Sequence, residues 1–410
     1  MTEHLKSKSR PPSYYIRKRL LRNKLAILGL SVIFLSIVVA LLGYLIMPDS
    51  TPMANEMSLQ LSTKKPGFSI DMLLIRKNQE SSSTNLFMKM LFGAESHFTS
   101  IPINEYHFEG ADIVIQEYSG LETRKSEKKR FNLADVLYPL NIEQTDLQVI
   151  GDFIHFTDLS GTRMYRSISE MQAEVKAHNI ERKTYYLGTD RFGRDMLSRL
   201  IGGTRVSLSV GLISVIISLL IGITLGALAG FFRGRTDNII MWFINVIWAI
   251  PTLLLVIAIT LALGRGFWQV FVAVGLTMWV EVARLVRGQI FSIREMEFIE
   301  AGRALGFDNY RLIMKHILPN IIGPVIVISA ANFASAILLE AGLSFLGMGA
   351  QPPMPSWGVM IKENYGYIIV DAAYLAILPG LAIMIMVLAF NLVGNGLRDA
   401  FDARETLSNF

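Results

Sequence analysis

The sequence predicts an all-α polytopic membrane protein with six transmembrane helices and a small α+β extracytoplasmic insertion between the first two. Of its 410 residues, 51% are hydrophobic and only 18% are charged, whereas soluble domains carry about 25% charged residues. Several apolar runs reach the roughly 20 residues that a helix needs to cross the hydrocarbon core of a bilayer. One long polar stretch separates the first run from the others and predicts the insertion.

Composition also excludes several classes of function. The chain has no cysteine, which rules out disulfides, thiolate metal sites and cysteine nucleophiles. Its six histidines lack the close spacing of a zinc site. The net charge of +5 does not indicate nucleic acid, because membrane proteins concentrate lysine and arginine in cytoplasmic loops. The sequence has no P-loop and no catalytic constellation, so we expect no enzyme activity, no metal and no cofactor in this chain.

The predicted organisation follows the apolar runs. Residues 1–24 form a basic cytoplasmic N-terminus, and the run at 25–47 is longer than the roughly 7–15 apolar residues of a signal peptide, which predicts an uncleaved anchor. The insertion covers 48–185, an outer interfacial segment 186–206, a five-helix core 207–397 and a cytoplasmic C-terminus 398–410. The predicted spans of the core are 207–232, 238–263, 267–285, 321–346 and 372–393. Six crossings put both termini in the cytoplasm, and arginines gather in the loops placed inside.

Three features inside the predicted spans concern packing or function. Gly222, Gly226 and Gly230 repeat every four residues, a spacing that lets helices approach closely. Pro251 should kink its span, and the kink either lines a translocation path or fits neighbouring helices. Glu340 lies at membrane depth, where an ionisable group is a candidate functional residue. The alternative, which we favour, is that its carboxylate is solvated in an aqueous outer vestibule.

The loop at 286–320 is charged and helix-forming, although apolar runs flank it. Ser292 and Glu295 fit a capping box at the start of a first helix, and Gly306 suits the left-handed conformation that ends it. Asp308 is a good N-cap for a second helix, and Pro319 fits the end of that helix. The prediction is two short cytoplasmic helices joined by a glycine turn.

The first of these helices carries an apolar stripe. Phe298, Ala301 or Gly302, and Leu305 fall at helical spacing on one face. Such a stripe suits a groove on another protein, but it equally suits the surface of a bilayer. The residues alone leave both alternatives open.

This loop resembles the EAA loop of ABC-importer permeases, whose pattern is Glu-Ala-Ala, three residues, Gly, nine residues, Ile, one residue, Leu-Pro. Glu300, Ala301, Gly306, Leu318 and Pro319 fall on that pattern. In the family, the loop forms the coupling helix that seats in a cleft of the ATPase subunit. The resemblance therefore implies an ATPase-docking site, whose residues in this chain are Phe298, Glu300, Ala301, Gly302, Arg303, Leu305, Gly306 and Pro319.

Two positions depart from the pattern. Gly302 replaces the second alanine, which should lower the stability of the first helix by about 1 kcal/mol. His316 stands where the pattern has isoleucine. The run His-Ile-Leu-Pro-Asn that contains it is similar to the oligopeptide/dipeptide branch of the family, so His316 indicates the branch.

Other stretches resemble the C-type permease subunits of oligopeptide/dipeptide (nickel) ABC importers, a binding-protein-dependent inner-membrane family. They are LGTDRFGRDMLSRLIGGTRVSLSVG at 187–211, LSFLGMGAQPPMPSWG at 343–358 and NGLRDAFDAR at 395–404. The resemblance implies the type I importer permease architecture and a permease subunit that translocates peptides across the bacterial cytoplasmic (inner) membrane.

The resemblance also implies partners. These are a homologous second permease, two P-loop ATPase subunits that bind ATP and Mg, an extracytoplasmic substrate-binding protein and the lipid bilayer. The alternatives are nickel or another small solute as cargo, a mechanotransmission-type ABC membrane protein, and an ion-coupled secondary transporter. Mechanotransmission proteins typically have four spans, and secondary transporters commonly show internal repeats; the sequence shows neither feature.

The segments before the core carry their own predictions. Asp190 with Arg194, and Asp195 with Arg199, are spaced for ion pairs worth a few tenths of a kcal/mol each, which predicts an interfacial helix ending at 202–203. Within the insertion, 111–118 and 147–156 alternate like strands and 164–178 predicts a helix, with loops at 81–84 and 124–130. The insertion docks the binding protein, covers the partner permease or is a lineage-specific addition; the sequence leaves these open.

Overall fold

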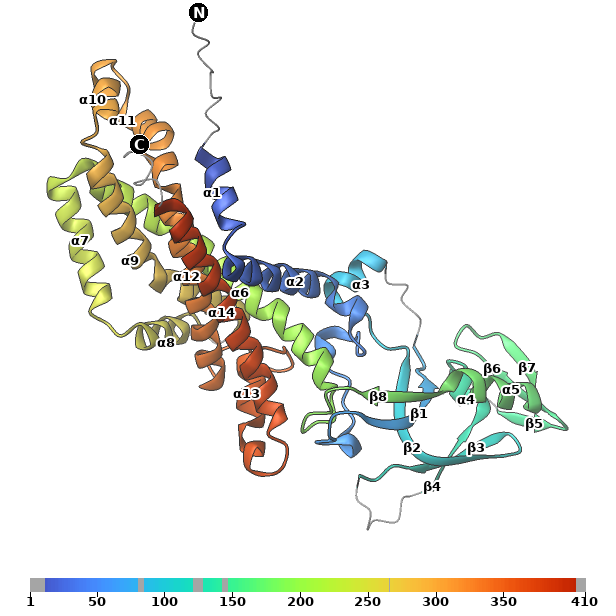
Figure 1. The fold of residues 1–410 in the computed structure, drawn as a ribbon. Helices are drawn as coiled ribbons and strands as arrows, with labels where there is room; N and C mark the ends of the chain where they lie inside the picture. The colour runs from blue at the N-terminus through green and yellow to red at the C-terminus, as the bar shows by residue number, and fades with distance from the viewer. Residues whose placement is uncertain (1–11, 80–84, 121–127, 142–146, 265, 403–410) are drawn as a thin grey trace, which may run out of the picture. The chain divides into compact units, whose positions relative to one another are not determined.

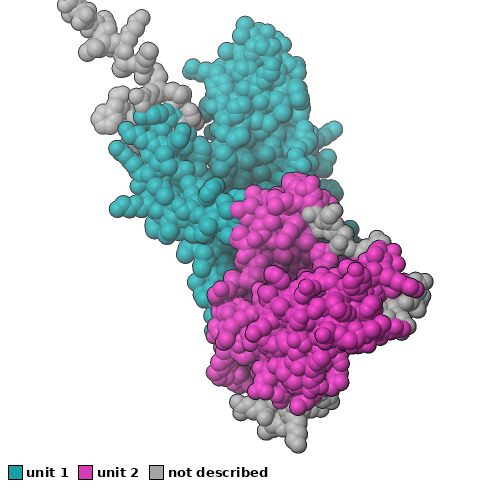
Figure 2. Space-filling model, turned by 90° about the vertical axis from the view of Figure 1, so that its right-hand side faces the viewer, with its two compact units in different colours: residues 1–40, 203–365, 376–410 teal, residues 41–202, 366–375 magenta. Residues whose placement is uncertain are grey.

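The computed structural model describes residues 12–79, 85–120, 128–141, 147–264 and 266–402. The chain divides into two compact units. The first, here called the membrane unit, contains residues 1–40, 203–365 and 376–410; the second, the sheet unit, contains 41–202 and 366–375. Figure 2 colours the membrane unit teal and the sheet unit magenta.

Among the described residues, five helices are long and apolar enough to cross a membrane, and a bent pair of helices adds a sixth span if it is counted as one. Figure 1 shows these helices. The five are α2 (Lys24–Ile46), α6 (Met196–Phe232), α9 (Phe267–Ile293), the continuous helix Asn309–Phe345 and α14 (Tyr374–Asp402). The bent pair is α7 (Gly234–Trp248) and α8 (Thr252–Leu263), which meet at 93°. The predicted polytopic helical class is confirmed.

Small residues on α6 pack against α9, as the glycine spacing predicts. A Cβ atom at Gly222 would lie 2.5 Å from the Cβ of Val282, and one at Gly226 would lie 2.6 Å from the carbonyl oxygen of Ala283. At Gly230, the same atom would lie 2.9 Å from the carbonyl oxygen of Arg287. Because two of these neighbours are backbone atoms, any side chain here would push the two helices apart.

The prediction of a separate interfacial helix ending at 202–203 is wrong. The helix begins at Met196 and continues without a break to Phe232. Gly203 has a packing role instead, since a Cβ atom there would lie 2.5 Å from the indole ring of Trp357. That tryptophan begins α13 (Trp357–Asn364). The glycine is explained by close approach rather than by helix termination.

The sheet unit holds a five-stranded antiparallel sheet of order β4-β3-β2-β1-β8 and a three-stranded sheet of order β5-β6-β7. Its first core lies between the larger sheet and the helices α4 (Leu133–Leu137) and α5 (Ile168–Glu174), where Leu73, Ile113 and Val136 are fully buried. The strands are β1 Phe68–Arg76, β2 Phe98–Glu109, β3 Asp112–Glu117, β4 Lys128–Asn132, β5 Gln148–Ile150, β6 Phe153–Thr157, β7 Arg163–Ser167 and β8 Ile180–Tyr185.

The predicted strand at 111–118 is confirmed as β3. The predicted strand at 147–156 is instead a hairpin of β5 and β6, which turns at Gly151 with a φ of +60°. The helix predicted at 164–178 begins as β7, because that stretch pairs with β6, and becomes helical only at Ile168. The loop predicted at 81–84 lies outside the described residues, as does 124–127, whereas 128–130 belongs to β4.

Charged side chains beside the start of α6 are buried rather than solvated. Asp190 Oδ2 accepts from Arg194 Nε at 2.6 Å, and Arg199 Nε lies 3.6 Å from the same oxygen, with all three side chains 1% exposed. Asp195 Oδ2 accepts from the backbone N–H and hydroxyl of Ser198 at 2.7 and 2.5 Å. Burial raises the pKa of Asp195. Burying these charged groups costs solvation energy that offsets much of their mutual attraction. We therefore infer that the ion pairs fix the position of the chain here rather than add much stability.

Two further polar contacts shape the sheet unit. Lys183 Nζ lies 2.7 Å from Glu56 Oε2. Burial alone would raise the pKa of Glu56, but the Lys183 ammonium and the Ser100 hydroxyl more than offset burial, so that the pKa falls below its usual value. Lys65 pairs with Asp371 at 2.5 Å, which joins the loop at 366–375 to this unit.

Candidate functional site

The segment between α9 and α12 contains all the predicted docking residues except Pro319, which lies in the first turn of α12. After α9, the chain forms α10 (Glu297–Ala304), a turn, α11 (Asn309–Arg311), a π-helical turn (Leu312–Ile317) and α12 (Leu318–Phe345). Here the run from α10 to the π-helical turn is called the coupling segment. Figure 1 shows α10 and α11 at the opposite end of the membrane unit from α13.

The predicted capping box is wrong. Ser292 lies inside α9, and the N-cap of α10 is Met296, whose side chain makes no capping bond. The reason is burial, because Ile290 and Ile293 belong to an apolar core that holds α9 helical past the serine. Glu295 is used elsewhere, since its carboxylate pairs with Arg233 at 2.6 Å.

The glycine turn is confirmed. Gly306 has a φ of +79°. Its N–H donates to the carbonyl of Arg303 at 2.9 Å, and the N–H of Phe307 donates to the carbonyl of Gly302 at 3.0 Å. These two bonds form a Schellman motif, which satisfies the last carbonyls of α10. Asp308 stands at the N-cap position of α11, although its side chain makes no capping bond.

The two faces of α10 have different surroundings. Ile299 and Gly302 are buried, whereas Phe298 and Leu305 are 42% and 74% exposed. Glu300, Ala301 and Arg303 are exposed as well. A Cβ atom at Gly302 would lie 2.9 Å from Leu312 Cδ2, so the departure from the Glu-Ala-Ala pattern has a packing reason. The predicted apolar stripe therefore faces outward, on a helix fixed by its other face.

The predicted helix boundary at Pro319 is wrong. The helix runs without a break from Asn309 to Phe345, and Pro319 is its second residue after the change from π to α geometry. A π-helical turn shifts the hydrogen-bond register by one residue, which accommodates a residue that has no backbone donor. The coupling segment is consequently continuous with a membrane-spanning helix.

A shared apolar core anchors the coupling segment. Ile299 of α10 and Leu312 of the π-helical turn are buried with Phe231 of α6 and Val286 of α9. Polar contacts reinforce the same place, because Arg294 donates to the carbonyl of Phe231. The coupling segment is therefore packed in one core with residues of three membrane-spanning helices, α6, α9 and the helix Asn309–Phe345.

The sequence reading missed a clamp between α7 and α9. Arg287 Nε and Nη2 bind the two carboxylate oxygens of Asp237 at 2.5 and 2.6 Å. Asp237 is 8% exposed, and planar bidentate pairs of this kind are both strong and directional. The one sequence feature that could have indicated this ion pair is Asp237 itself, an aspartate at the start of an apolar run.

The prediction that Glu340 is solvated is wrong. It is 1% exposed, and its Oε1 accepts from the Ser344 hydroxyl at 2.6 Å. Ser356, whose hydroxyl lies 3.4 Å from that of Ser344, caps α13 by accepting from the N–H of Val359 at 3.1 Å. These side chains link the outer part of α12 to the start of α13.

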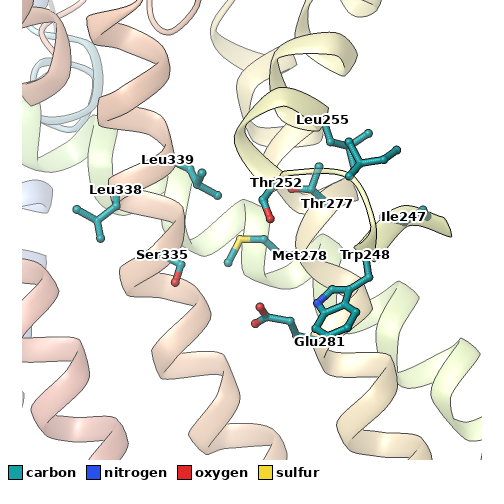
Figure 3. A pocket seen from close by; sticks show the side chains of 11 residues that line it. Ile247, Trp248, Thr252, Leu255, Thr277, Met278, Glu281, Ser335, Leu338 and Leu339 are labelled. Carbon is teal, nitrogen blue, oxygen red and sulfur yellow. The ribbon is translucent and has the colours of Figure 1, made fainter. Parts of the chain in front are cut away.

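A cavity of about 320 Å³ lies beside the break between α7 and α8. Pro251 is the N-cap of α8, so the predicted kink is confirmed as a break in the helix. Figure 3 shows Glu281 of α9 with its carboxylate toward the cavity, which the sequence reading did not single out. The lining residues are Ile247, Trp248, Ile250, Thr252, Leu255, Thr277, Met278, Glu281, Ser335, Leu338 and Leu339.

Two family models match this chain. Residues 222–406, which include the coupling segment, match the binding-protein-dependent transport system inner membrane component. Residues 12–61 match the N-terminal transmembrane domain of oligopeptide transport permease C. The chain belongs to the family of binding-protein-dependent transport system inner membrane components. This membership decides against the mechanotransmission and secondary-transporter alternatives.

Relatives named for the solutes they transport agree with the family. A glutathione transport system permease protein of Pectobacterium atrosepticum is 43% identical over 220 residues, which cover 54% of this chain and 73% of that protein. A dipeptide transport system permease protein of Alkalihalophilus pseudofirmus is 42% identical, with 54% and 72% covered. An oligopeptide transport system permease protein of Bacillus subtilis is 37% identical over 222 residues, with 54% and 72% covered. This protein is thus a multi-pass inner-membrane permease, and the family models leave 62–221 unmatched.

Proposed function

We propose that this permease is a subunit of an ATP-driven ABC importer that carries peptides across the bacterial cytoplasmic membrane. The observation that carries the proposal is the identity of 37–43% to permeases named for glutathione, dipeptide and oligopeptide transport. All three solutes are amide-linked amino acids that carry free amino and carboxylate groups. Peptides are therefore favoured over nickel, for which the described residues hold no cluster of three or more potential metal ligands.

The proposed complex contains a homologous second permease, two P-loop ATPase subunits that bind ATP and Mg, and an extracytoplasmic binding protein. Support for ATPase docking comes from α10, where Phe298 and Leu305 are exposed while Ile299 is fully buried. An exposed apolar pair on a fixed helix suits a groove on a partner. Because the coupling segment continues into a membrane-spanning helix, ATP-driven movement of the groove would reach the membrane as a rigid-body shift.

The proposed orientation puts both termini and the coupling segment in the cytoplasm. In Figure 1, α1 (Pro12–Leu20) and the last turns of α14 lie at the same end of the membrane unit as α10. That end carries Arg17, Arg303 and Arg311 among other basic residues, in line with the positive-inside rule. The sheet unit is accordingly extracytoplasmic.

Uptake in cells tests the proposal. A strain that lacks this permease and one that expresses it are compared for initial uptake of labelled dialanine, trialanine, glutathione and nickel ion. We expect permease-dependent uptake of at least one peptide, which an ATPase-inactive partner subunit abolishes. Uptake of nickel alone, or equal peptide uptake in both strains, would overturn the peptide assignment.

A further inference from the structure

We propose that the cavity beside the α7–α8 break binds the cationic ammonium group of the transported solute through the carboxylate of Glu281. This proposal deepens the proposed function and rests on it, because the ammonium belongs to a peptide only if peptides are the cargo. Glu281 is the fifteenth of the 27 residues of α9, so it lies near the middle of a membrane-spanning helix. Within the predicted span at 267–285 it lies four residues before the inner end, and an ionisable side chain inside such a span is a candidate functional residue.

The neighbouring cation of α9 is held by residues of α7 rather than by Glu281. Arg284 is one turn away on α9, but its guanidinium stacks 3.9 Å from the ring centre of Trp248 and donates to Asn245 Oδ1 at 2.8 Å. Across the described part of the chain, Glu281 has neither a salt bridge nor a side-chain hydrogen bond, and its side chain is exposed. The oxygens of this side chain are therefore open to a donor in the cavity.

The other lining groups also suit an ammonium ion. Thr277 donates its hydroxyl proton to the carbonyl of Val274 at 2.8 Å, so its oxygen has only acceptor capacity left for a ligand. The thioether of Met278 supplies polarisable surface to the cavity, and the indole of Trp248, on which Arg284 stacks, forms part of its wall. Figure 3 shows Trp248 and Met278 around Glu281, with Ser335 on the other side of the cavity.

Size and charge limit the class of ligand. About 320 Å³ is at the lower end of the roughly 300–1,000 Å³ of small-molecule sites, which suits one end or one side chain of a peptide. A divalent metal would need several ligands, and the described residues contain no group of three or more histidines and carboxylates. One carboxylate with neutral acceptors instead matches a monovalent ammonium, from either an amino terminus or a lysine side chain.

Uptake by cells that express the complete transporter tests the inference. The labelled peptides are trialanine, Ala-Lys-Ala and Ala-Glu-Ala, and the variants are Glu281→Gln and Glu281→Asp. Glu105→Gln is the matched control, because it removes an exposed carboxylate from β2 in the sheet unit. Since a charged hydrogen-bond partner is lost, we expect Glu281→Gln to lower maximal uptake about tenfold, Glu281→Asp to retain most of it, and the control to match wild type.

The peptides identify the source of the ammonium. An equal loss for all three assigns the amino terminus, and a loss confined to Ala-Lys-Ala assigns the lysine side chain. Unchanged uptake in Glu281→Gln would overturn the inference while leaving the proposed function intact. If wild-type cells import none of the peptides, the proposed function fails first.

A binding measurement separates ligand contact from assembly. The complete membrane complex in nanodiscs, without binding protein, is titrated with Ala-Lys-Ala and trialanine while tryptophan fluorescence is recorded. We expect a saturable change that Trp248→Phe removes and that Glu281→Gln shifts to about tenfold higher peptide concentration. An unshifted titration in Glu281→Gln would show that Glu281 does not bind the peptide and would overturn the inference. Loss of the second permease on co-purification would show that Glu281 serves subunit contacts and would overturn it as well.

Discussion

Replacing Gly306 should uncouple ATP hydrolysis from transport without preventing membrane insertion. With φ at +79° and no atom within 4 Å of an added Cβ, the effect of a side chain is backbone strain alone. For an L-residue this conformation costs about 1–2 kcal/mol, and more for a β-branched one. A free-energy cost of about 1.4 kcal/mol changes an equilibrium constant tenfold. We therefore expect Gly306→Val to lower the population of molecules with the native turn by about tenfold or more.

The assay is the ratio of peptide imported to ATP hydrolysed by the complete complex in proteoliposomes. Gly288→Ala is the control for Gly306→Ala, because an added Cβ at Gly288 also meets no atom within 4 Å but lies in ordinary helix. We expect Gly306→Val to have the lowest ratio and Gly306→Asn to be milder than alanine, since asparagine tolerates the left-handed region. A wild-type ratio in Gly306→Val would refute the role of this turn in coupling.

Three further results follow from the structure. Asp237→Ala leaves Arg287 without its bidentate partner and should lower unfolding stability by about 2 kcal/mol, seen as a lower midpoint of thermal unfolding of the complex; no change would contradict the clamp. Gly226→Val should cost about 1–3 kcal/mol by forcing α6 from a carbonyl of α9, with reduced yield of folded protein as the readout and normal yield as the contrary result. The lowered pKa of Glu56 means that its ionised form stabilises the sheet unit above pH 4.5 and that this stabilisation is lost as pH falls through the folded-state pKa. Hydrogen exchange of the intact complex should therefore show faster exchange near Lys183 at acid pH in wild type. Glu56→Gln should flatten that pH dependence. Identical pH profiles for the wild type and Glu56→Gln would argue against a stabilising role of the Glu56 carboxylate.

The features predicted well from the sequence depend on local composition or on one residue's conformation. Apolar runs indicated the helical membrane class because hydrocarbon demands about 20 apolar residues per crossing. The turn at Gly306 could be predicted because a left-handed backbone conformation strongly favours glycine. The kink at Pro251 could be predicted because proline has no backbone N–H and so interrupts the hydrogen bonds of a helix.

The features predicted wrongly depend on packing between distant segments. Ser292 has a good capping sequence, but the burial of Ile293 keeps α9 helical there. Gly203 looks like a helix end, but it makes room for the indole of Trp357. For Glu281 and Glu340, the sequence gives depth in the membrane but cannot show that one faces a cavity and the other is buried.

Cross-linking from one position tests most directly whether the coupling segment docks on an ATPase. The chain has no cysteine, so Leu305→Cys creates a unique thiol on a side chain that is 74% exposed. Tyr165→Cys, at a side chain 70% exposed in the sheet unit, is the control. After both are labelled with a thiol-reactive photocross-linker in transport-active membranes, the account predicts a cross-link from position 305, but not from 165, to a P-loop ATPase. A transport-active complex in which position 305 cross-links no ATPase would contradict it.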